Sequence, residues 1–234
     1  MADFGRRPKR QLPPPAPKMH IKWSPALAYV VGLITTDGSL SNDKRHIVFT
    51  SSDLQLIKTF KKCLKLENKT TLNPFGQYAK LQSYKIQFSN TVFYNWLLKI
   101  GLHANKTHDI GPLKIPNRYF PDFIRGHIDG DGSIFIYKDS HNKYKEKNYT
   151  YNRLYITLRS SSKPHLIWIR SKLNNFLDIK GSLSGWKRKE RKIKLWSLRF
   201  CKKDSVKFLP WLYYKKDLPC LRRKYKIANK FIKN

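Results

Sequence analysis

Several short stretches of this 234-residue chain alternate apolar and polar residues with a period of two, as β-strands with one buried face do. The stretches form two sets, one in each half of the chain and in the same order. Their apolar positions are Ile47, Phe49, Tyr84, Ile86, Phe88, Leu154, Ile156, Leu158, Trp196, Leu198 and Phe200. We therefore expect two antiparallel sheets, each with an apolar face under helices and a polar face on the other side.

Longer stretches have the period of an α-helix. Residues 53–66 and 164–177 are amphipathic and predict helices that back the two sheets. Ser24 and Pro25 form a good helix start, and Pro121 can play the same part in the second half. Each half thus contains a helix, a strand pair, a helix, a second strand pair and a further helix. The predicted fold class is α+β, with two pseudo-symmetric αββαββα repeats.

The first 22 residues differ from the rest because they are basic and rich in proline. Residues 1–22 predict a flexible arm, with phosphate contact as the alternative interpretation. The remaining chain is assigned to a first repeat at residues 23–114 and a second at residues 115–234. The repeats are unequal, since the stretch from Lys138 to Asn152 has no counterpart in the first half. This stretch predicts an extended hairpin or loop.

The first helix of each predicted repeat ends in a near-copy of one motif, VGLITTDG at residues 31–38 and RGHIDGDG at residues 125–132. In both copies a glycine stands five residues before an aspartate. Small residues four apart lie on one helical face, and they allow two helix backbones to approach closely. We expect the two helices to pack on each other through Gly32 and Gly126.

Such packing would place Asp37 and Asp131 side by side at the ends of two helices. Their carboxylates would repel each other, and a hard divalent cation would relieve that repulsion. Ligation by oxygen atoms alone indicates Mg²⁺. A single Asp-Gly-Ser sequence is most often a turn. Two copies, each after a glycine-bearing helix, favour a paired metal site.

The chain carries 48 Lys and Arg against 15 Asp and Glu, so its natural partner is a polyanion. Polar strand faces are usually only solvated, but here both halves present side chains suited to a DNA groove. The residues expected to bind DNA are Ser39, Lys44, His46, Thr50, Lys85, Gln87, Arg153, Tyr155, Thr157, Arg159, Lys187, Lys189, Lys192, Lys194, Ser197 and Arg199.

Other classes of protein are disfavoured by the sequence. It has no apolar run long enough for a membrane span, and its beginning lacks the apolar core of a secretory signal. The three cysteines are odd in number and widely spaced, which argues against a disulfide framework or a zinc site. We expect a reducing intracellular compartment, either a bacterial or archaeal cytoplasm or an organelle.

From about residue 24 to the end, the chain resembles the LAGLIDADG homing endonucleases of the monomeric, two-motif type. The resemblance implies paired motif helices and two DNA-binding sheets that form a saddle. It also implies a metal-dependent double-strand break in an asymmetric DNA site of about 20 bp. Two or three Mg²⁺ ions would be held by Asp37, Asp131 and the backbone carbonyls of Thr36 and Gly130. Such enzymes are encoded by mobile introns or intein-like elements.

In this family a basic residue near the end of each half assists catalysis, and the best matches are Lys106 and Lys224. Either lysine could instead be a phosphate contact or surface charge. The first motif has Thr35 where the second has Asp129, but the family's essential acid directly precedes the final glycine. Two alternatives with the same fold remain: an intron maturase that acts on RNA, and a DNA-binding regulator that does not cleave. The two retained aspartates argue against the regulator.

Overall fold

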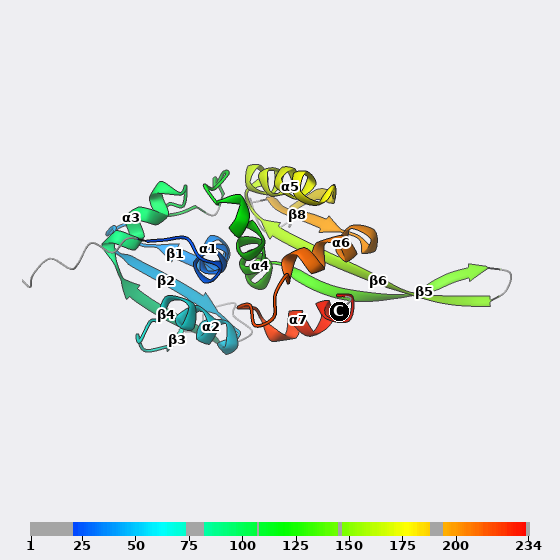
Figure 1. Ribbon diagram of the computed structural model, residues 1–234, viewed down its shortest axis with the longest axis horizontal. Helices are drawn as coiled ribbons and strands as arrows, with labels where there is room; N and C mark the ends of the chain where they lie inside the picture. Colours follow the sequence, from blue (N-terminus) through cyan, green and yellow to red (C-terminus); the bar gives the residue numbers. More distant parts are fainter. Residues whose placement is uncertain (1–20, 74–81, 107, 145–146, 188–193, 233–234) are drawn as a thin grey trace, which may run out of the picture.

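The structure is a computed structural model, and it describes residues 21–73, 82–106, 108–144, 147–187 and 194–232 (Figure 1). The expected arm lies outside these residues, apart from its last two positions. The expected DNA contacts Lys189 and Lys192 also lie outside the described residues.

The first repeat has the predicted order of elements. Its four strands form one antiparallel sheet in the order β1-β2-β4-β3. The elements are α1 (Pro25–Asp37), β1 (Gly38–Leu40), β2 (His46–Ser51), α2 (Leu54–Leu64), β3 (Thr71–Asn73), β4 (Ser83–Ser89) and α3 (Thr91–Lys99).

The second repeat has the same order, with a short 3₁₀-helix before it and one more helix after it. Its sheet has the matching strand order β5-β6-β8-β7 and is also antiparallel. The elements are η1 (Asn117–Tyr119), α4 (Phe120–Asp131), β5 (Ser133–Tyr144), β6 (Lys147–Ser160), α5 (Lys163–Leu177), β7 (Ser182–Lys187), β8 (Lys194–Phe200), α6 (Lys202–Leu212) and α7 (Arg222–Ala228). The predicted α+β class with two αββαββα repeats is confirmed.

The helix starts follow from the local sequence. The Ser24 hydroxyl accepts a hydrogen bond from the Leu27 amide at 3.1 Å, and Pro25 is the first residue of α1. In the second repeat, Pro121 lies in the first turn of α4. The residue before this helix, Tyr119, makes no side-chain capping bond. The 3₁₀ turn η1 leads the chain into α4 instead.

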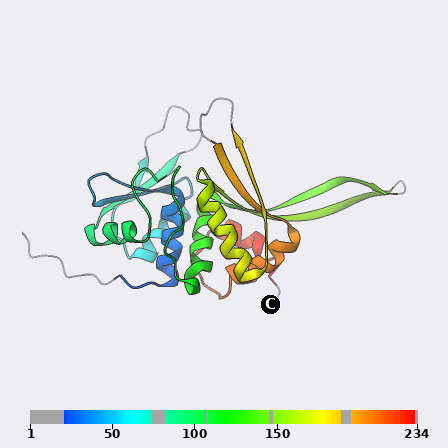
Figure 2. The same ribbon diagram turned by 90° about the horizontal axis from the view of Figure 1, so that it is seen from above.

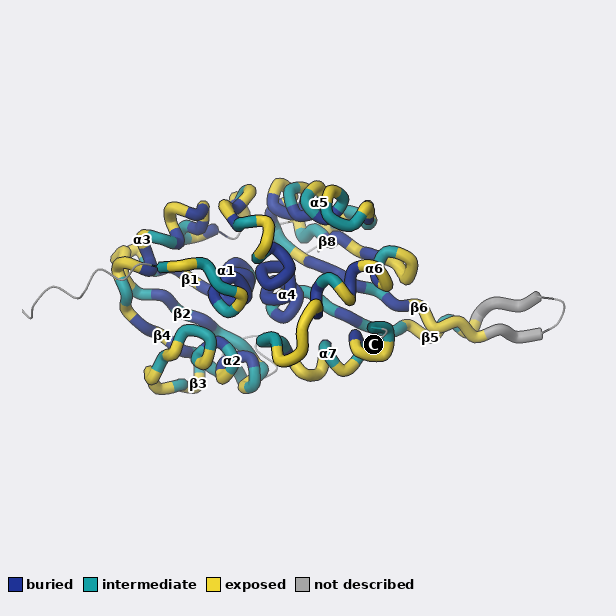
Figure 3. The backbone as a smooth tube through the Cα atoms, viewed as in Figure 1, coloured by how far each residue is buried: buried dark blue, intermediate teal, exposed yellow. Residues whose placement is uncertain are grey.

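The motif helices α1 and α4 form the centre of the molecule, side by side, with one sheet on either side (Figure 1). Both helices are buried around most of their circumference (Figure 3). The apolar strand faces complete the core; for example, Phe49 of β2 stacks on Phe60 of α2 with ring centroids 4.4 Å apart.

In Figure 2 most helices lie toward the lower side of the picture and the strands toward the upper side. One long hairpin projects from the body of the molecule. This hairpin is β5–β6, whose pairing runs from Ser133 opposite Thr157 to Tyr144 opposite Lys147. The register shifts between Asp139 and Asn142. The predicted extension of the second repeat is therefore a hairpin that reaches beyond the sheet.

Candidate active site and nucleic-acid interface

The seam between α1 and α4 requires glycine at two positions. A Cβ atom added to Gly32 would lie 2.7 Å from the His127 amide nitrogen and would clash with the Phe123 carbonyl oxygen. A Cβ atom added to Gly126 would lie 2.9 Å from the Tyr29 carbonyl carbon and would clash with its oxygen. The two backbones approach so closely that their C-terminal ends lie together.

Asp37 ends α1 and Asp131 ends α4, so the close seam brings the two aspartates to one place. The Thr36 hydroxyl donates a hydrogen bond to Oδ2 of Asp37 at 3.0 Å. A Cβ atom added to Gly130 would lie 2.5 Å from that same Oδ2. The Asp37 carboxylate is thus packed against the end of the opposite motif helix.

Burial is the main reason that the pKa of Asp37 rises to about 7, and repulsion from Asp131 adds to it. Burial also raises the pKa of Asp131, whereas the nearby cations Lys224 and Arg159 lower it. Lysines act on both carboxyls, since Lys224 and Lys106 also lower the pKa of Asp37, but burial outweighs them at each aspartate. The site therefore favours additional positive charge.

The two motif helices end against one buried lysine each. The ammonium of Lys106 donates a hydrogen bond to the Gly38 carbonyl oxygen. The ammonium of Lys224 donates to the carbonyl oxygens of Ile128 at 2.5 Å, Asp129 at 3.0 Å and Gly132 at 2.8 Å. Carbonyls at a helix C-terminus lack partners within the helix and carry partial negative charge, so a cation stabilises them.

The sequence left open whether these lysines assist catalysis, contact phosphate or are only surface charge, and their burial excludes the last of these. Lys106 and Lys224 are only 6% and 3% exposed, which excludes solvated surface charge for both. Burial lowers the pKa of each lysine to about 8. Attraction to carboxylates acts in the opposite direction, from Asp37 on the pKa of Lys106 and from Asp129, Asp37 and Asp131 on the pKa of Lys224.

The difference between the motifs at Thr35 and Asp129 has a structural cause. In α1, the Thr35 hydroxyl donates to the Val31 carbonyl oxygen of its own helix at 2.7 Å. In α4, Oδ2 of Asp129 accepts from the Tyr29 hydroxyl at 2.9 Å and from the Leu221 amide at 2.7 Å. Asp129 thus joins both motif helices to the start of α7, the helix that carries Lys224. In the sequence, the only sign of this role was that the second copy of the motif has an aspartate where the first has a threonine.

Sequence reasoning also missed a buried arginine. Arg125 of α4 is fully buried and pairs with Asp122 at 2.5 Å. Its remaining donors bond the carbonyl oxygens of Leu212 and Pro219, each at 2.8 Å. These contacts hold the segment between α6 and α7 against α4. The available signal was a pair of opposite charges three residues apart, Asp122 and Arg125, on one face of the motif helix.

On the first sheet, most of the expected DNA contacts lie on the polar face. Ser39 and Gln87 are exposed, while Thr50 and Lys85 are half-buried and lie opposite each other on β2 and β4. His46 is half-buried and bonds the Asp43 carboxylate. Lys44 differs from expectation: it lies in the turn before β2, with a φ of 60°.

On the second sheet, Arg153, Arg159 and Arg199 are exposed on the polar face, and Tyr155 is half-buried there. The Arg199 guanidinium lies over the Tyr155 ring at 5.6 Å, and Arg153 pairs with Asp139 at 2.6 Å. These arginines and the aromatic ring all lie on the polar face of the sheet.

Four further expected contacts on this sheet are placed differently from the exposed arginines. Thr157 and Ser197 are buried, and each lies opposite a longer side chain, Arg199 and Arg159 respectively. Lys194 lies on the same face as Trp196 and stacks on its ring at 4.4 Å, so it lies on the face opposite Arg199. Lys187 is exposed and pairs with Lys194 in register, which places it on that same face.

The donor set at the aspartate pair suits a hard cation. The two carboxylates, with the carbonyl oxygens of Thr36 and Gly130 next to them in the sequence, would offer oxygen ligands alone, which Mg²⁺ and Ca²⁺ prefer. Among the described residues no group of three or more His, Cys, Asp or Glu side chains could hold a metal ion. Two protein carboxylates would therefore need carbonyl, water or phosphate oxygens to complete a coordination shell.

In the described part of the chain no helix is both long and apolar enough to cross a membrane.

Comparison with known proteins places the fold. Residues 24–71 match the family described as LAGLIDADG-like domain. No curated protein matches the chain in sequence. The solved structures that resemble it are less than 25% identical, so they show the fold alone.

Meganuclease I-SmaMI bound to uncleaveable DNA is 14% identical, with a TM-score of 0.56 over 87% of this chain and 88% of that one. I-DmoI in complex with DNA and Ca is 15% identical, with a TM-score of 0.55 over 88% and 97% of the two chains. Full-length DUF199/WhiA from Thermatoga maritima is 16% identical, with a TM-score of 0.52 over 90% of this chain. The present chain spans only 61% of WhiA. Residues 24–71 thus match a LAGLIDADG-like domain, and the chain as a whole has the fold of the two-motif LAGLIDADG homing endonucleases.

Proposed function

We propose that this protein is a site-specific homing endonuclease that makes a metal-dependent double-strand break in DNA. The observation that carries the proposal is the duplicated arrangement of one aspartate and one buried lysine at the end of each motif helix. Cutting both strands of a duplex requires two such arrangements at one interface. The enzyme would act as a monomer on an asymmetric target of about 20 bp, and a mobile intron or intein-like element would encode it.

Asp37, Asp131 and the carbonyl oxygens of Thr36 and Gly130 would hold two or three Mg²⁺ ions. When bound, the metal polarises the phosphoryl oxygen, lowers the pKa of the attacking water and stabilises the leaving oxygen. The protein's own part is to keep two carboxylates close together despite their repulsion, which the buried seam of α1 and α4 achieves.

Lys106 and Lys224 complete each half of the site. Their ammonium groups bind the carbonyl oxygens at the helix ends and therefore fix the backbone beside each aspartate. Both would also offset negative charge at a scissile phosphate, because each buried ammonium binds the end of a motif helix that carries one of the two aspartates.

Double-stranded DNA is the proposed substrate because of the net charge of +33 and the arginine-bearing polar face of the second sheet. I-SmaMI and I-DmoI, which share the fold, are both described in complexes with DNA. WhiA also shares the fold, and its description names a LAGLIDADG domain without an endonuclease. A DNA-binding protein that does not cleave is therefore the second candidate.

The deciding experiment is selection of cleaved sites from a randomised DNA library with Mg²⁺, followed by plasmid cleavage at the selected site. Asp37→Asn and Asp131→Asn should each abolish or severely reduce double-strand cutting while binding of the site is largely retained. The removed charge would have held the metal rather than the DNA. A double Asn variant that linearises the plasmid at the wild-type rate would refute the assignment. Sequence-specific binding with no cutting would favour the second candidate, and preferential binding of structured RNA would favour a maturase.

A further inference from the structure

The helix that carries Lys224 does not cap itself. The residue before α7, Leu221, makes no side-chain capping bond, so the first amides of the helix need partners from elsewhere. The Leu221 amide donates to Oδ2 of Asp129 at 2.7 Å. The Arg222 amide donates to Oε1 of Gln55 at 3.1 Å. Asp129 belongs to the second repeat, but Gln55 belongs to the first.

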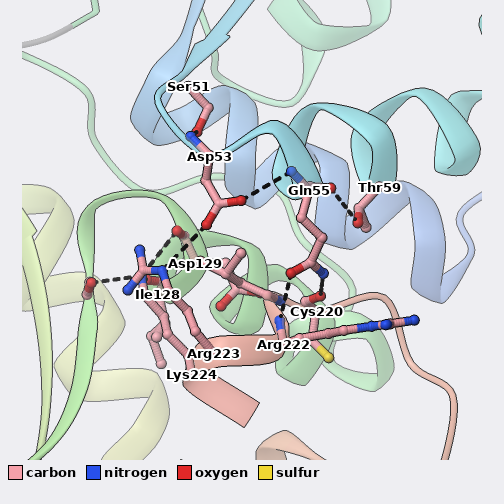
Figure 4. Close-up of polar contacts among 12 residues, drawn as sticks. Ser51, Asp53, Gln55, Thr59, Ile128, Asp129, Cys220, Arg222, Arg223 and Lys224 are labelled. Atoms are coloured by element: carbon pink, nitrogen blue, oxygen red, sulfur yellow. Dashed lines mark hydrogen bonds and ion pairs between the residues drawn. The ribbon is translucent and has the colours of Figure 1, made fainter. Parts of the chain in front are cut away.

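Gln55 uses both ends of its amide on the same short segment (Figure 4). While Oε1 accepts from the Arg222 amide, Nε2 donates to the Cys220 carbonyl oxygen at 3.0 Å. The Gln55 backbone is itself fixed in the first turn of α2, because its amide donates to the capping carboxylate of Asp53 at 3.0 Å. One side chain of the first repeat thus holds the backbone of the second on both sides of residue 221.

A second contact between α2 and α7 is weaker. Asp53 and Arg223 approach within 3.4 Å, but the Arg223 side chain is 65% exposed. An ion pair in water contributes little, because solvent screens the charges and two side chains lose freedom. Among the described residues, the side chains that hydrogen-bond the backbone of residues 220–222 are Gln55 and Asp129.

The hydrogen bonds from Gln55 to residues 220 and 222 lie directly before the active-site lysine in the sequence. Lys224 follows Arg222 by two residues, and its ammonium must meet three carbonyl oxygens at the end of α4. The buried end of a long side chain keeps such a position only if its backbone is held as well. A residue of the first half thus holds the backbone just before the lysine of the second half.

We propose that Gln55 is a positioning residue for Lys224, through which the first repeat controls cleavage by the second half of the site. Its effect on cutting rests on the proposed endonuclease function, whereas its effect on the place of Lys224 does not. The test therefore has one measurement that needs no cleavage and one that does.

The variant is Gln55→Leu, which keeps the size of the side chain and removes both hydrogen bonds. Gln55→Glu keeps the acceptor for Arg222 but cannot donate to Cys220, and provides a milder change. The matched control is Thr59→Val, which removes one hydrogen bond one turn further along α2, where the hydroxyl donates to the Gln55 carbonyl oxygen of its own helix. Circular dichroism and thermal unfolding verify that each variant is folded.

The first measurement is the rate of amine acetylation at each lysine, followed by mass spectrometry. We expect Lys224 to react several-fold faster in Gln55→Leu, with an intermediate rate in Gln55→Glu and the wild-type rate in Thr59→Val. Reaction at Lys106 should stay unchanged in all three variants. An unchanged rate at Lys224 in both folded Gln55 variants would overturn the proposal, whether or not the protein cuts DNA.

The second measurement follows each DNA strand separately, with a label on either end of the target. Misplacing a catalytic group by about 1 Å can reduce a rate by about 100-fold. We expect Gln55→Leu to slow one strand by about 10- to 100-fold more than the other, so that nicked plasmid accumulates. Lys224→Met should slow the same strand, and the double variant should be no slower than Lys224→Met alone. Equal slowing of both strands, or additive effects, would overturn the proposal. Absence of cutting by the wild type would instead refute the proposed function, and the labelling result would still decide the role of Gln55.

Discussion

Gly126 lies where the two motif helices come closest, and its replacement tests the packing of the seam. We expect Gly126→Ala to lower the free energy of unfolding by about 1–3 kcal/mol or more, because the added methyl group meets the Tyr29 backbone. Gly111→Ala is the matched control, since no atom lies within 4 Å of a Cβ placed there. Urea unfolding of both variants provides the measurement. Equal stability of the two would show that the helices are not so closely packed.

A pair of buried histidines makes stability depend on pH. Burial lowers the pKa of His165 from 6.5 to about 4, and the pKa of the stacked His127 also lies well below its ordinary value. Between pH 6.5 and 4 the unfolded chain binds protons that folded His165 does not accept, so stability falls as pH falls. For His165 alone the loss is about 3 kcal/mol over this range, at about 1.4 kcal/mol for each pH unit.

The carboxyls of Asp37 and Asp131 act in the opposite direction, because their pKa values are raised by folding. The contribution of His165 to the pH dependence of stability is therefore measured as the difference in the free energy of unfolding between wild type and His165→Gln. Denaturant unfolding at several pH values should show that the free energy of unfolding falls less steeply with falling pH in the variant. The difference in slope should correspond to about one proton. Parallel curves would mean that His165 is protonated in the folded protein.

Single residues also show where the sequence stops being informative. Asp37 and Asp131 could be singled out because the motif occurs twice. Asp129 could not be given its role, since that role depends on where α7 lies, far along the chain. The burial of Thr157 and Ser197 was equally hidden: alternation assigns a side chain to a face, but burial on that face depends on its neighbours in the sheet.

Whole elements were predicted more completely than single contacts. The two-residue and 3.6-residue periods are local properties of the chain, and they identified both repeats and the apolar faces of their strands. The added helix α7 and the 3₁₀ turn η1 were not foreseen, since short helices carry little periodic signal. The unequal length of the repeats correctly indicated the β5–β6 hairpin.

The β5–β6 hairpin is expected to read DNA at one end of the target. In the test variant, a two-residue Asn-Gly turn replaces residues 139–151 and joins Lys138 to Asn152, which are already opposite each other. The inner pairs of the sheet, such as Ile134 with Ile156, remain intact. Specificity should relax at one outer end of the site by about 1–3 kcal/mol for each lost base contact.

A profile of all single-base substitutions across the target measures this effect for both proteins. Discrimination near the cut and in the other half-site should be the same as in the wild type. Losses spread over both half-sites would show that the hairpin supports the fold or the contact between repeats, and the DNA-reading role would be abandoned.

For the molecule as a whole, charge should dominate affinity. With a net charge of +33, binding to duplex DNA should weaken steeply as salt concentration rises. For about 6–10 neutralised phosphates, the slope of log affinity against log salt is on the order of −5 to −9. Fluorescence anisotropy over a series of salt concentrations measures this slope. A nearly flat dependence would point away from a protein that fills a DNA groove.

The projecting hairpin belongs to only one of the two repeats (Figure 1). Once both strands are cut, each repeat would hold one of the two new DNA ends, and these ends would be held unequally. We expect the end under the second repeat to dissociate later, because more protein surface covers it. The break would then become accessible to repair one end at a time, in an order set by the direction in which the protein sits on its target.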